Sequence, residues 1–289
     1  MAVANPAVIS VLGRDQKGVV ARVSTYLAQH NVNIEKIDQN VMEGLFIMSM
    51  LVDLRDLDIN LDRLILDLKA IGSEMQMDVT VRLHGQRSRK RVAVLVSKEP
   101  HCLEALLGAL AQGELDAEFT TVLSNHPDLE SVAKEHGLAF RWSPSTDKSA
   151  HMRFILEQLG AEQPDLVVLA RYMQIVSPEI VRAFPHRILN IHPSLLPYYP
   201  GANAYKQAYE AGIRVCGCTA HIVTEELDKG PVVLQDVFHI RVGEDSLETI
   251  KGNGRALEAK VLTKAVQLFV RDELVVTDGK VLFRPGRVA

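Results

Sequence analysis

The sequence has few cysteines, few aromatic residues and no long hydrophobic run. Only three of its 289 residues are cysteine, and two of them, Cys216 and Cys218, alternate within one expected strand. This odd number disfavours a disulfide framework and predicts a reduced, cytoplasmic setting. No apolar stretch approaches the roughly 20 residues that a membrane-spanning helix needs, and the first five residues lack the basic start of a secretory signal. We therefore expect a soluble, unprocessed protein with no membrane partner.

The sequence also lacks a strong excess of charge of either sign. Its 32 Lys and Arg residues stand against 36 Asp and Glu residues, which gives a net charge of -4 at pH 7. Nucleic acids and anionic membranes bind to basic faces that make many phosphate contacts. We therefore expect no nucleic-acid partner, and a small-molecule partner is favoured. The 47% hydrophobic and 24% charged residues are typical of a globular protein, and the length allows two domains.

The first part of the chain follows the order strand, helix, strand, strand, helix, strand. The expected strands are residues 8–12, 34–41, 45–53 and 75–83, and the expected helices are residues 18–30 and 61–71. Both helices carry apolar residues three and four positions apart, so each can cover one face of a sheet. This order is typical of a ferredoxin-like α/β domain.

The loop before the first helix carries a recognisable motif. The segments from Gly13 to Val20 and from Asn31 to Ile34 resemble the ACT domain family of small regulatory modules, over about the first 85 residues. The resemblance implies a homo-oligomer, a dimer or a tetramer, and an amino-acid effector bound near Asp15, Gly18 and Asn33. A purely structural role stays open, with Gly18 permitting a tight turn and Asp15 helping to start the helix.

Residues 85–91 form a polar, basic segment that we interpret as a linker between domains of residues 1–84 and 92–289. As a nucleic-acid patch it is too short and lacks interleaved aromatic residues. From residue 92 short apolar strands alternate with helices, which predicts a mostly parallel sheet covered on both faces. The expected strands are 92–96, 119–123, 139–142, 166–169, 188–192, 215–223 and 232–240, the expected helices are 103–112, 129–136, 152–159 and 247–271, and a short hairpin follows. Ligands in such sheets bind at the carboxyl ends of strands.

Two segments of the second domain carry a donor, a base and a carboxylate. Residues two apart on a strand share one face, so Asn190 and His192 are expected to point into one pocket. The later segment Leu227-Asp228-Lys229-Gly230-Pro231 adds the carboxylate of Asp228. An amide donor can stabilise an oxyanion, and an imidazole with a pKa of about 6.5 can act as base and then acid. Each residue alone is as readily a cap or a turn, but the combination favours formyl chemistry.

These segments, with Pro200-Gly201-Ala202 and His221-Ile222-Val223, resemble the folate-dependent formyltransferase and deformylase superfamily in order and spacing. The resemblance extends over residues 91–283 and implies a Rossmann-like catalytic domain. It implies that Asn190, His192 and Asp228 are catalytic. It also implies that the folate is bordered by Met173, Gln174, Val176 and Val223, although core packing explains Met173 and Val176 equally well.

The loop after strand 92–96 bears on the formyl acceptor. The segment from Ser97 to Leu103 lacks the Gly-Asn-Gly-Ser type loop that cradles a phosphate in transferases acting on glycinamide ribonucleotide. It resembles 10-formyltetrahydrofolate deformylases instead, as does the fused ACT domain. The resemblance implies hydrolysis of 10-formyltetrahydrofolate in one-carbon metabolism and purine biosynthesis, with folate as substrate and no tightly bound cofactor. His101 is a candidate contact to substrate or product.

The sequence is compatible with two other functions. Pro193 and Leu195 stand where the deformylase pattern has His and Phe, as in the transferase branch, so formyl transfer to an amine stays open. A folate- or amino-acid-binding regulator without turnover is a third interpretation, which the intact catalytic set disfavours. No metal is expected, because Cys216 and Cys218 have no second Cys or His pair at a metal-binding spacing.

Overall fold

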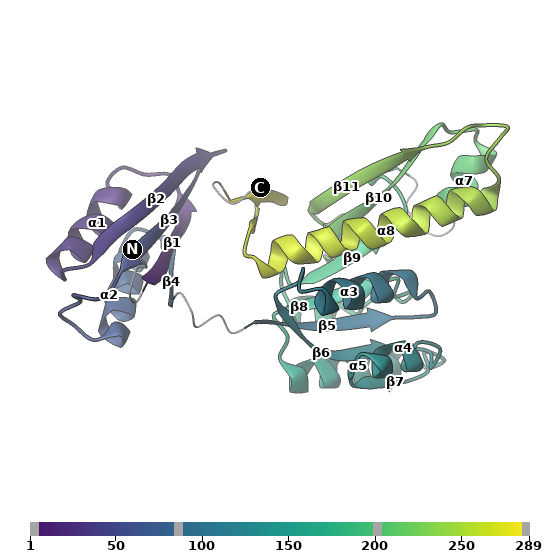
Figure 1. Cartoon of the computed structure of the whole chain (residues 1–289), viewed down its shortest axis with the longest axis horizontal. Coiled ribbons are helices and arrows are strands. Elements are labelled where there is room, and N and C mark those ends of the chain that lie inside the picture. Colours follow the sequence, from purple (N-terminus) through teal and green to yellow (C-terminus); the bar gives the residue numbers. More distant parts are fainter. Residues whose placement is uncertain (1–5, 84–88, 199–203, 285–289) are drawn as a thin grey trace. The chain divides into compact units, whose positions relative to one another are not determined.

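The computed structural model describes residues 6–83, 89–198 and 204–284. Its contacts divide the chain into two compact units (Figure 1). Of the described residues, the first unit holds 6–83 with 283–284, and the second holds 89–282. Each unit has its own hydrophobic core. Of the expected linker, residues 85–88 lie outside the described residues, and Lys90 and Arg91 belong to a strand of the second unit.

The first unit is a four-stranded antiparallel sheet with two helices packed on it. The sheet has the order β2-β3-β1-β4. Its elements in chain order are β1 (Pro6–Arg14), α1 (Val19–Gln29), β2 (Asn33–Met42), β3 (Leu45–Asp53), α2 (Leu61–Glu74) and β4 (Met77–Leu83). Leu27 of α1 and Leu64 and Leu68 of α2 pack with Ile9, Met48 and other strand residues in one core. The predicted ferredoxin-like order is confirmed.

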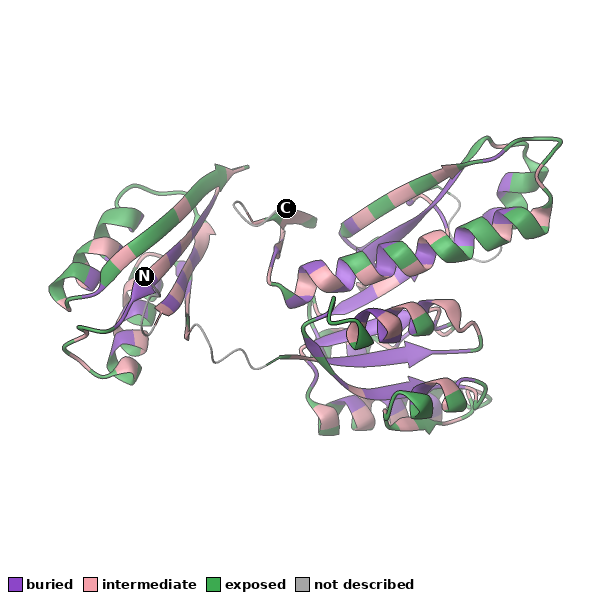
Figure 2. Cartoon of the chain, in the orientation of Figure 1, coloured by how far each residue is buried: buried purple, intermediate pink, exposed green. Residues whose placement is uncertain are grey.

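The second unit is built on a seven-stranded, mostly parallel sheet of order β11-β10-β9-β8-β5-β6-β7. Its parallel strands are β5 (Lys90–Val96), β6 (Ala117–Ser124), β7 (Phe140–Trp142), β8 (Leu166–Ala170) and β9 (Ile188–His192). Two antiparallel strands, β10 (Val215–Ile222) and β11 (Val232–His239), complete one edge. Strand β8 is buried throughout. Figure 2 shows β5 buried along most of its length, whereas exposed and intermediate residues alternate along most of β11. The predicted fold class is confirmed.

Helices cover both faces of this sheet. One face carries α3 (His101–Ala111), α4 (Glu130–Glu135) and α8 (Leu247–Val270), and the other carries α5 (Lys148–Glu162) and α6 (Pro178–Ala183). A further helix, α7 (Ala204–Glu210), packs on a smaller cluster beside β10. Along the chain β6 and β7 lie on one side of β5, and β8 and β9 lie on the other. In open sheets of this kind ligands bind where the strand order switches direction, which here is at the carboxyl ends of β5 and β8.

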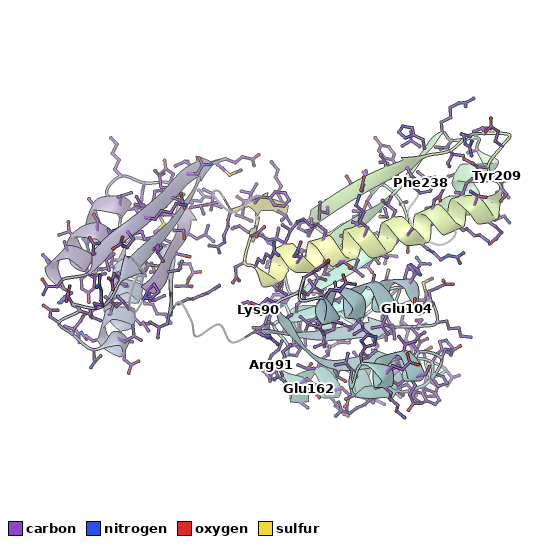
Figure 3. All side chains as sticks on the ribbon, viewed as in Figure 1. Lys90, Arg91, Glu104, Glu162, Tyr209 and Phe238 are labelled. Atoms are coloured by element: carbon purple, nitrogen blue, oxygen red, sulfur yellow. The ribbon has the colours of Figure 1, made fainter. Side chains whose placement is uncertain are left out.

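Several boundaries differ from the sequence prediction. A helix of six or seven residues spans only about two turns, so apolar periodicity is a weak signal for it. The sequence predicts α4, of six residues, but it does not predict α6 or α7. The strand expected from residue 75 begins at Met77, because Met75 caps the end of α2 through its backbone N–H. The side chain of Arg91 bonds the carbonyl of Glu162 at the end of α5 (Figure 3), which anchors the start of β5.

A two-stranded hairpin closes the described chain. It consists of β12 (Leu274–Thr277) and β13 (Lys280–Phe283). Asp278 and Gly279 at its turn both have a positive φ, as the tightest hairpin turns require. Among the described residues, no helix combines the length and the apolar composition needed to cross a membrane.

Candidate active site

Strand β9 presents Asn190 and His192 on one face of the sheet. Ile191 between them points the other way and is buried in the core beneath α3 and α8. In the antiparallel pairing with β10, Asn190 lies opposite His221 and His192 lies opposite Thr219. Directly opposed residues have neighbouring side chains. The pairing of β9 with β10 therefore adds His221 to the two residues that the sequence pattern selects.

His221 holds the side-chain amide of Asn190. Its Nε2 lies 3.1 Å from Asn190 Nδ2, and its Nδ1 lies 3.1 Å from the carbonyl oxygen of Ile222. Because a carbonyl only accepts, Nδ1 carries the proton and Nε2 accepts a hydrogen bond from the amide. Burial lowers the pKa of His221 below its usual value, which keeps the imidazole neutral. Asn190 thus has one N–H engaged and a second available to a ligand.

Asp228 approaches both histidines from the loop after β10. One of its carboxylate oxygens lies 3.4 Å from His192 Nδ1, and the other lies 3.8 Å from His221 Nε2. The side chain is 9% exposed, and the backbone is left-handed with a φ of 55°. A Cβ on Gly230 would lie 1.7 Å from the carbonyl oxygen of Ile222. Only glycine allows this turn to pack so closely against β10. Gly230 therefore helps to set the position of the Asp228 carboxylate.

The residues expected to border a folate occupy different environments. Met173 is 57% exposed, Gln174 is half-buried, and Val176 packs into the core beside α5 and α6. Val223 is half-buried and donates its N–H to the carbonyl of Ile188. Met173 and Gln174 therefore have surface available to a ligand, while Val176 contributes mainly to packing.

A buried polar network fixes the loop that carries Met173. Ser97, after β5, donates to Asn125 Oδ1 at 2.6 Å and accepts from the backbone N–H of Met173 at 2.9 Å. Asn125, after β6, also bonds Ser145. Sequence reasoning assigned no role to Ser97, Asn125 or His221. The sequence could have indicated them, because all three are polar residues at the carboxyl ends of buried strands. Buried polar side chains need hydrogen-bond partners.

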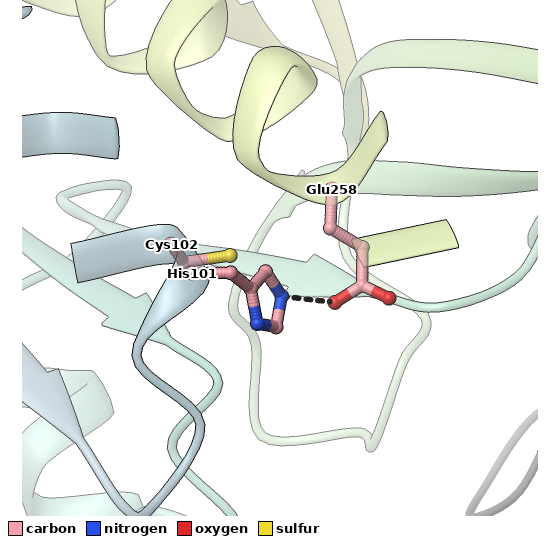
Figure 4. A group of neighbouring side chains, drawn as sticks. All are labelled: His101, Cys102 and Glu258. Atoms are coloured by element: carbon pink, nitrogen blue, oxygen red, sulfur yellow. Dashed lines mark hydrogen bonds and ion pairs between the residues drawn. The ribbon is translucent and has the colours of Figure 1, made fainter. Parts of the chain in front are cut away.

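His101 binds a carboxylate of the fold. It is the first residue of α3, and its Nε2 lies 3.1 Å from Glu258 of α8 (Figure 4). His101, Cys102 and Glu258 are the one group of potential metal ligands among the described residues, with ligand atoms within 4.8 Å of one another. Arg171 Nε lies 3.4 Å from the same Glu258 oxygen, and burial followed by the Glu258 charge raises the pKa of the Cys102 thiol. A cation beside the carboxylate and a protonated thiol suit an ion pair better than a metal.

The expected effector loop has an ordered backbone. Gly18 caps α1 with a φ of 89° and without a side-chain hydrogen bond, so Asp15 does not cap this helix. The N–H of Asp15 bonds the carbonyl of Gly44 at 2.8 Å, and Asn33 donates to Glu35 at 2.7 Å. The side chain of Asp15 is exposed.

Known proteins match both parts of the chain. Residues 90–266 match the formyl transferase family and residues 5–82 match the ACT domain family. A formyltetrahydrofolate deformylase of Synechocystis is 37% identical over 270 residues, which cover 92% of this chain and 94% of the relative. The crystal structure of a formyltetrahydrofolate deformylase from Pseudomonas syringae superposes with a TM-score of 0.87 at 35% identity, and the match covers 96% of this chain and 94% of that chain.

A transferase matches a smaller part. Glycinamide ribonucleotide transformylase 1 from Symbiobacterium toebii is 35% identical with a TM-score of 0.65, and the match covers 70% of this chain and 96% of that chain. The likeness to the deformylases therefore extends over the ACT domain as well. The chain belongs to the formyltetrahydrofolate deformylases, a family of hydrolases, with an ACT domain followed by a formyl transferase domain.

Proposed function

We propose that this protein hydrolyses 10-formyltetrahydrofolate to formate and tetrahydrofolate, with Asn190, His192 and Asp228 as its catalytic residues. The family and the loop after β5 support water as the acceptor. The observation that carries the residue roles is the placement of Asp228 within 3.4 Å of His192 and of Asn190 within 3.1 Å of His221, on one face of β9 and β10. Met173, Gln174 and Val223 are proposed folate contacts.

The chemistry follows from these positions. His192 turns Nδ1 to Asp228, so Nε2 takes the proton of the attacking water as the bond from oxygen to the formyl carbon forms. The carbonyl oxygen becomes an oxyanion, and the second N–H of Asn190 donates to it. When the bond from the formyl carbon to N10 breaks, His192 returns the proton to N10. Asp228 stabilises the imidazolium present between the two transfers.

Turnover without an amine tests this proposal. Purified protein receives 10-formyltetrahydrofolate alone, and formate and tetrahydrofolate are followed over time. We expect both products in equal amounts. Product formation only after an amine is added would instead identify a formyltransferase, and binding without turnover in either case would identify a regulator.

His192→Ala tests the assigned base. We expect kcat to fall by a factor of about 100 or more, the usual contribution of a positioned general base, with the fold retained. His136→Ala is the matched control, because this histidine is exposed at the end of α4. A near-normal rate in His192→Ala would remove His192 from the mechanism.

The ACT domain supports a regulatory proposal. We infer that an amino acid binds near Asp15, Gly18 and Asn33 and that the protein assembles as a homo-oligomer. The match of residues 5–82 to this family supports a small-molecule effector.

A further inference from the structure

The carboxylate of Glu258 contacts side chains from three other parts of the second unit. Its side chain is 1% exposed on α8. Its Oε2 lies 3.1 Å from His101 Nε2 of α3 and 3.4 Å from Arg171 Nε after β8. Its Oε1 accepts a hydrogen bond of 2.8 Å from the hydroxyl of Tyr205 on α7. A buried carboxylate is stable only when it is paired and hydrogen-bonded.

Glu258 is ionised in this position. Burial raises the pKa of its carboxyl, but the hydrogen bonds from His101 and Tyr205 and the charge of Arg171 outweigh that effect, so the pKa is lowered overall. Glu99 also lies near His101, with an oxygen 3.8 Å from Nδ1. A Cβ on Gly254 of α8 would lie 2.3 Å from the ring of Tyr205, so this glycine allows Tyr205 to reach the carboxylate.

Arg171 begins the loop that leads to Met173 and Gln174. Its backbone has a φ of 60°, a conformation that non-glycine residues hold only when their surroundings impose it. The surroundings here are three anchors. Arg171 is held by Glu258 on the α8 face of the sheet, the next residue, Tyr172, bonds His151 of α5 on the opposite face, and the N–H of Met173 bonds Ser97. Successive residues fixed to opposite faces leave the backbone little freedom to rotate.

We propose that Glu258 is a positioning residue for folate binding, which acts by holding Arg171 and thereby the loop 171–174 in the shape that receives the substrate. This inference rests on the proposed function. The carboxylate touches no substrate. Its effect is on the fraction of molecules whose loop is ready to bind, so its loss weakens binding in proportion to that fraction.

Glu258→Gln tests the inference, because it removes the charge and keeps the size of the side chain. We measure the Kd for 5-formyltetrahydrofolate, a stable isomer of the substrate, by calorimetry. We expect it to rise about tenfold, the change in affinity that the loss of one charge-assisted contact produces. KM should rise by the same factor, and kcat should stay within about threefold. Glu248→Gln is the matched control on the same helix, since its side chain is 74% exposed and bonds only Lys251 among the described contacts.

Arg171→Gly provides a second route, because it removes the other partner of the same contact. Glycine adopts the left-handed backbone without strain, while Glu258 keeps His101 and Tyr205 as partners. We expect a similar rise in Kd, and the double variant should bind no more weakly than the weaker single variant, because both changes break one interaction. Melting temperatures are measured alongside, and all binding is recorded well below them.

The outcomes separate the two proposals. Turnover and binding in the wild type, with unchanged Kd in Arg171→Gly and Glu258→Gln, would overturn the positioning role alone. A fall in kcat with unchanged Kd would also overturn it, because Glu258 would then act in the chemistry. A wild-type protein that neither binds 5-formyltetrahydrofolate nor releases formate would overturn the proposed function and this inference with it.

Discussion

At the scale of single residues, the neutral state of His221 is central to the proposed chemistry. Its Nε2 can accept from Asn190 only while it carries no proton. Burial lowers the pKa of this imidazole, so it remains an acceptor at neutral pH. Asn190 then presents its second N–H in a fixed direction.

His221→Ala removes this acceptor. We expect kcat to fall about tenfold, which corresponds to the net free energy of one hydrogen bond, about 1.4 kcal/mol. His221→Gln restores an acceptor and should recover part of the rate. Steady-state kinetics with 10-formyltetrahydrofolate measures both variants, and a wild-type kcat in His221→Ala would contradict the assignment.

The pH dependence of stability gives an independent readout of the same variant. The pKa of His221 is lower in the folded than in the unfolded state, so the unfolded chain binds more protons between the two values. The neutral His221 therefore makes its full contribution to the free energy of unfolding above the unfolded pKa of about 6.5. That contribution is lost as the pH falls through the lower pKa of the folded state. Urea unfolding of His221→Ala should show a shallower loss of stability on the acid side than the wild type.

At the scale of elements, the turn after β10 is fitted to the strand through Gly230. A methyl group there would collide with the carbonyl oxygen of Ile222, which is backbone and cannot turn aside. The turn carries Asp228 two residues earlier, so any displacement moves the carboxylate away from His192.

Gly230→Ala should lower both activity and stability. We expect a loss of about 1–3 kcal/mol in the free energy of unfolding, as for other overpacked sites, and a larger relative loss in kcat. Gly160→Ala in α5 is the control, because nothing lies within 4 Å of its added Cβ and alanine favours a helix by up to about 1 kcal/mol. Chemical denaturation and turnover are measured for both, and a fully active Gly230→Ala would contradict the fitted turn.

At the scale of the whole molecule, all proposed catalytic residues lie in the second unit. The two cores that flank its sheet are built from residues between Val92 and Val270. The first unit likewise completes its core with residues before position 84. Each unit therefore has the buried apolar surface that independent folding requires.

A fragment of residues 89–289 should consequently fold alone. We expect a cooperative thermal transition and turnover of 10-formyltetrahydrofolate, because its sheet and catalytic residues are intact. Any response of the full chain to an amino acid should be absent from the fragment, since the proposed effector loop is removed. Circular dichroism and the formate assay test this, and a fragment that is unfolded in soluble form would contradict two independent domains.

The sequence alone was sufficient to predict the order of the long helices and strands and the family of the protein. Apolar periodicity is a local property, so it predicted the ferredoxin-like unit and the mostly parallel sheet. It is a weak signal over about two turns, so it missed the short helices α6 and α7 although it predicted the equally short α4. The alternation of Asn190, Ile191 and His192 also predicted which side chains share a face.

Only the tertiary structure decided which distant residues meet. The pairing of Asn190 with His221 depends on the register of two strands, and the burial of Glu258 beside Arg171 and His101 depends on where α8 crosses the sheet. Neither is fixed by the spacing of residues along the chain. A glutamate within a long helix is usually exposed to solvent. The packing of three other parts of the second unit around Glu258 makes it a buried partner of the proposed folate loop.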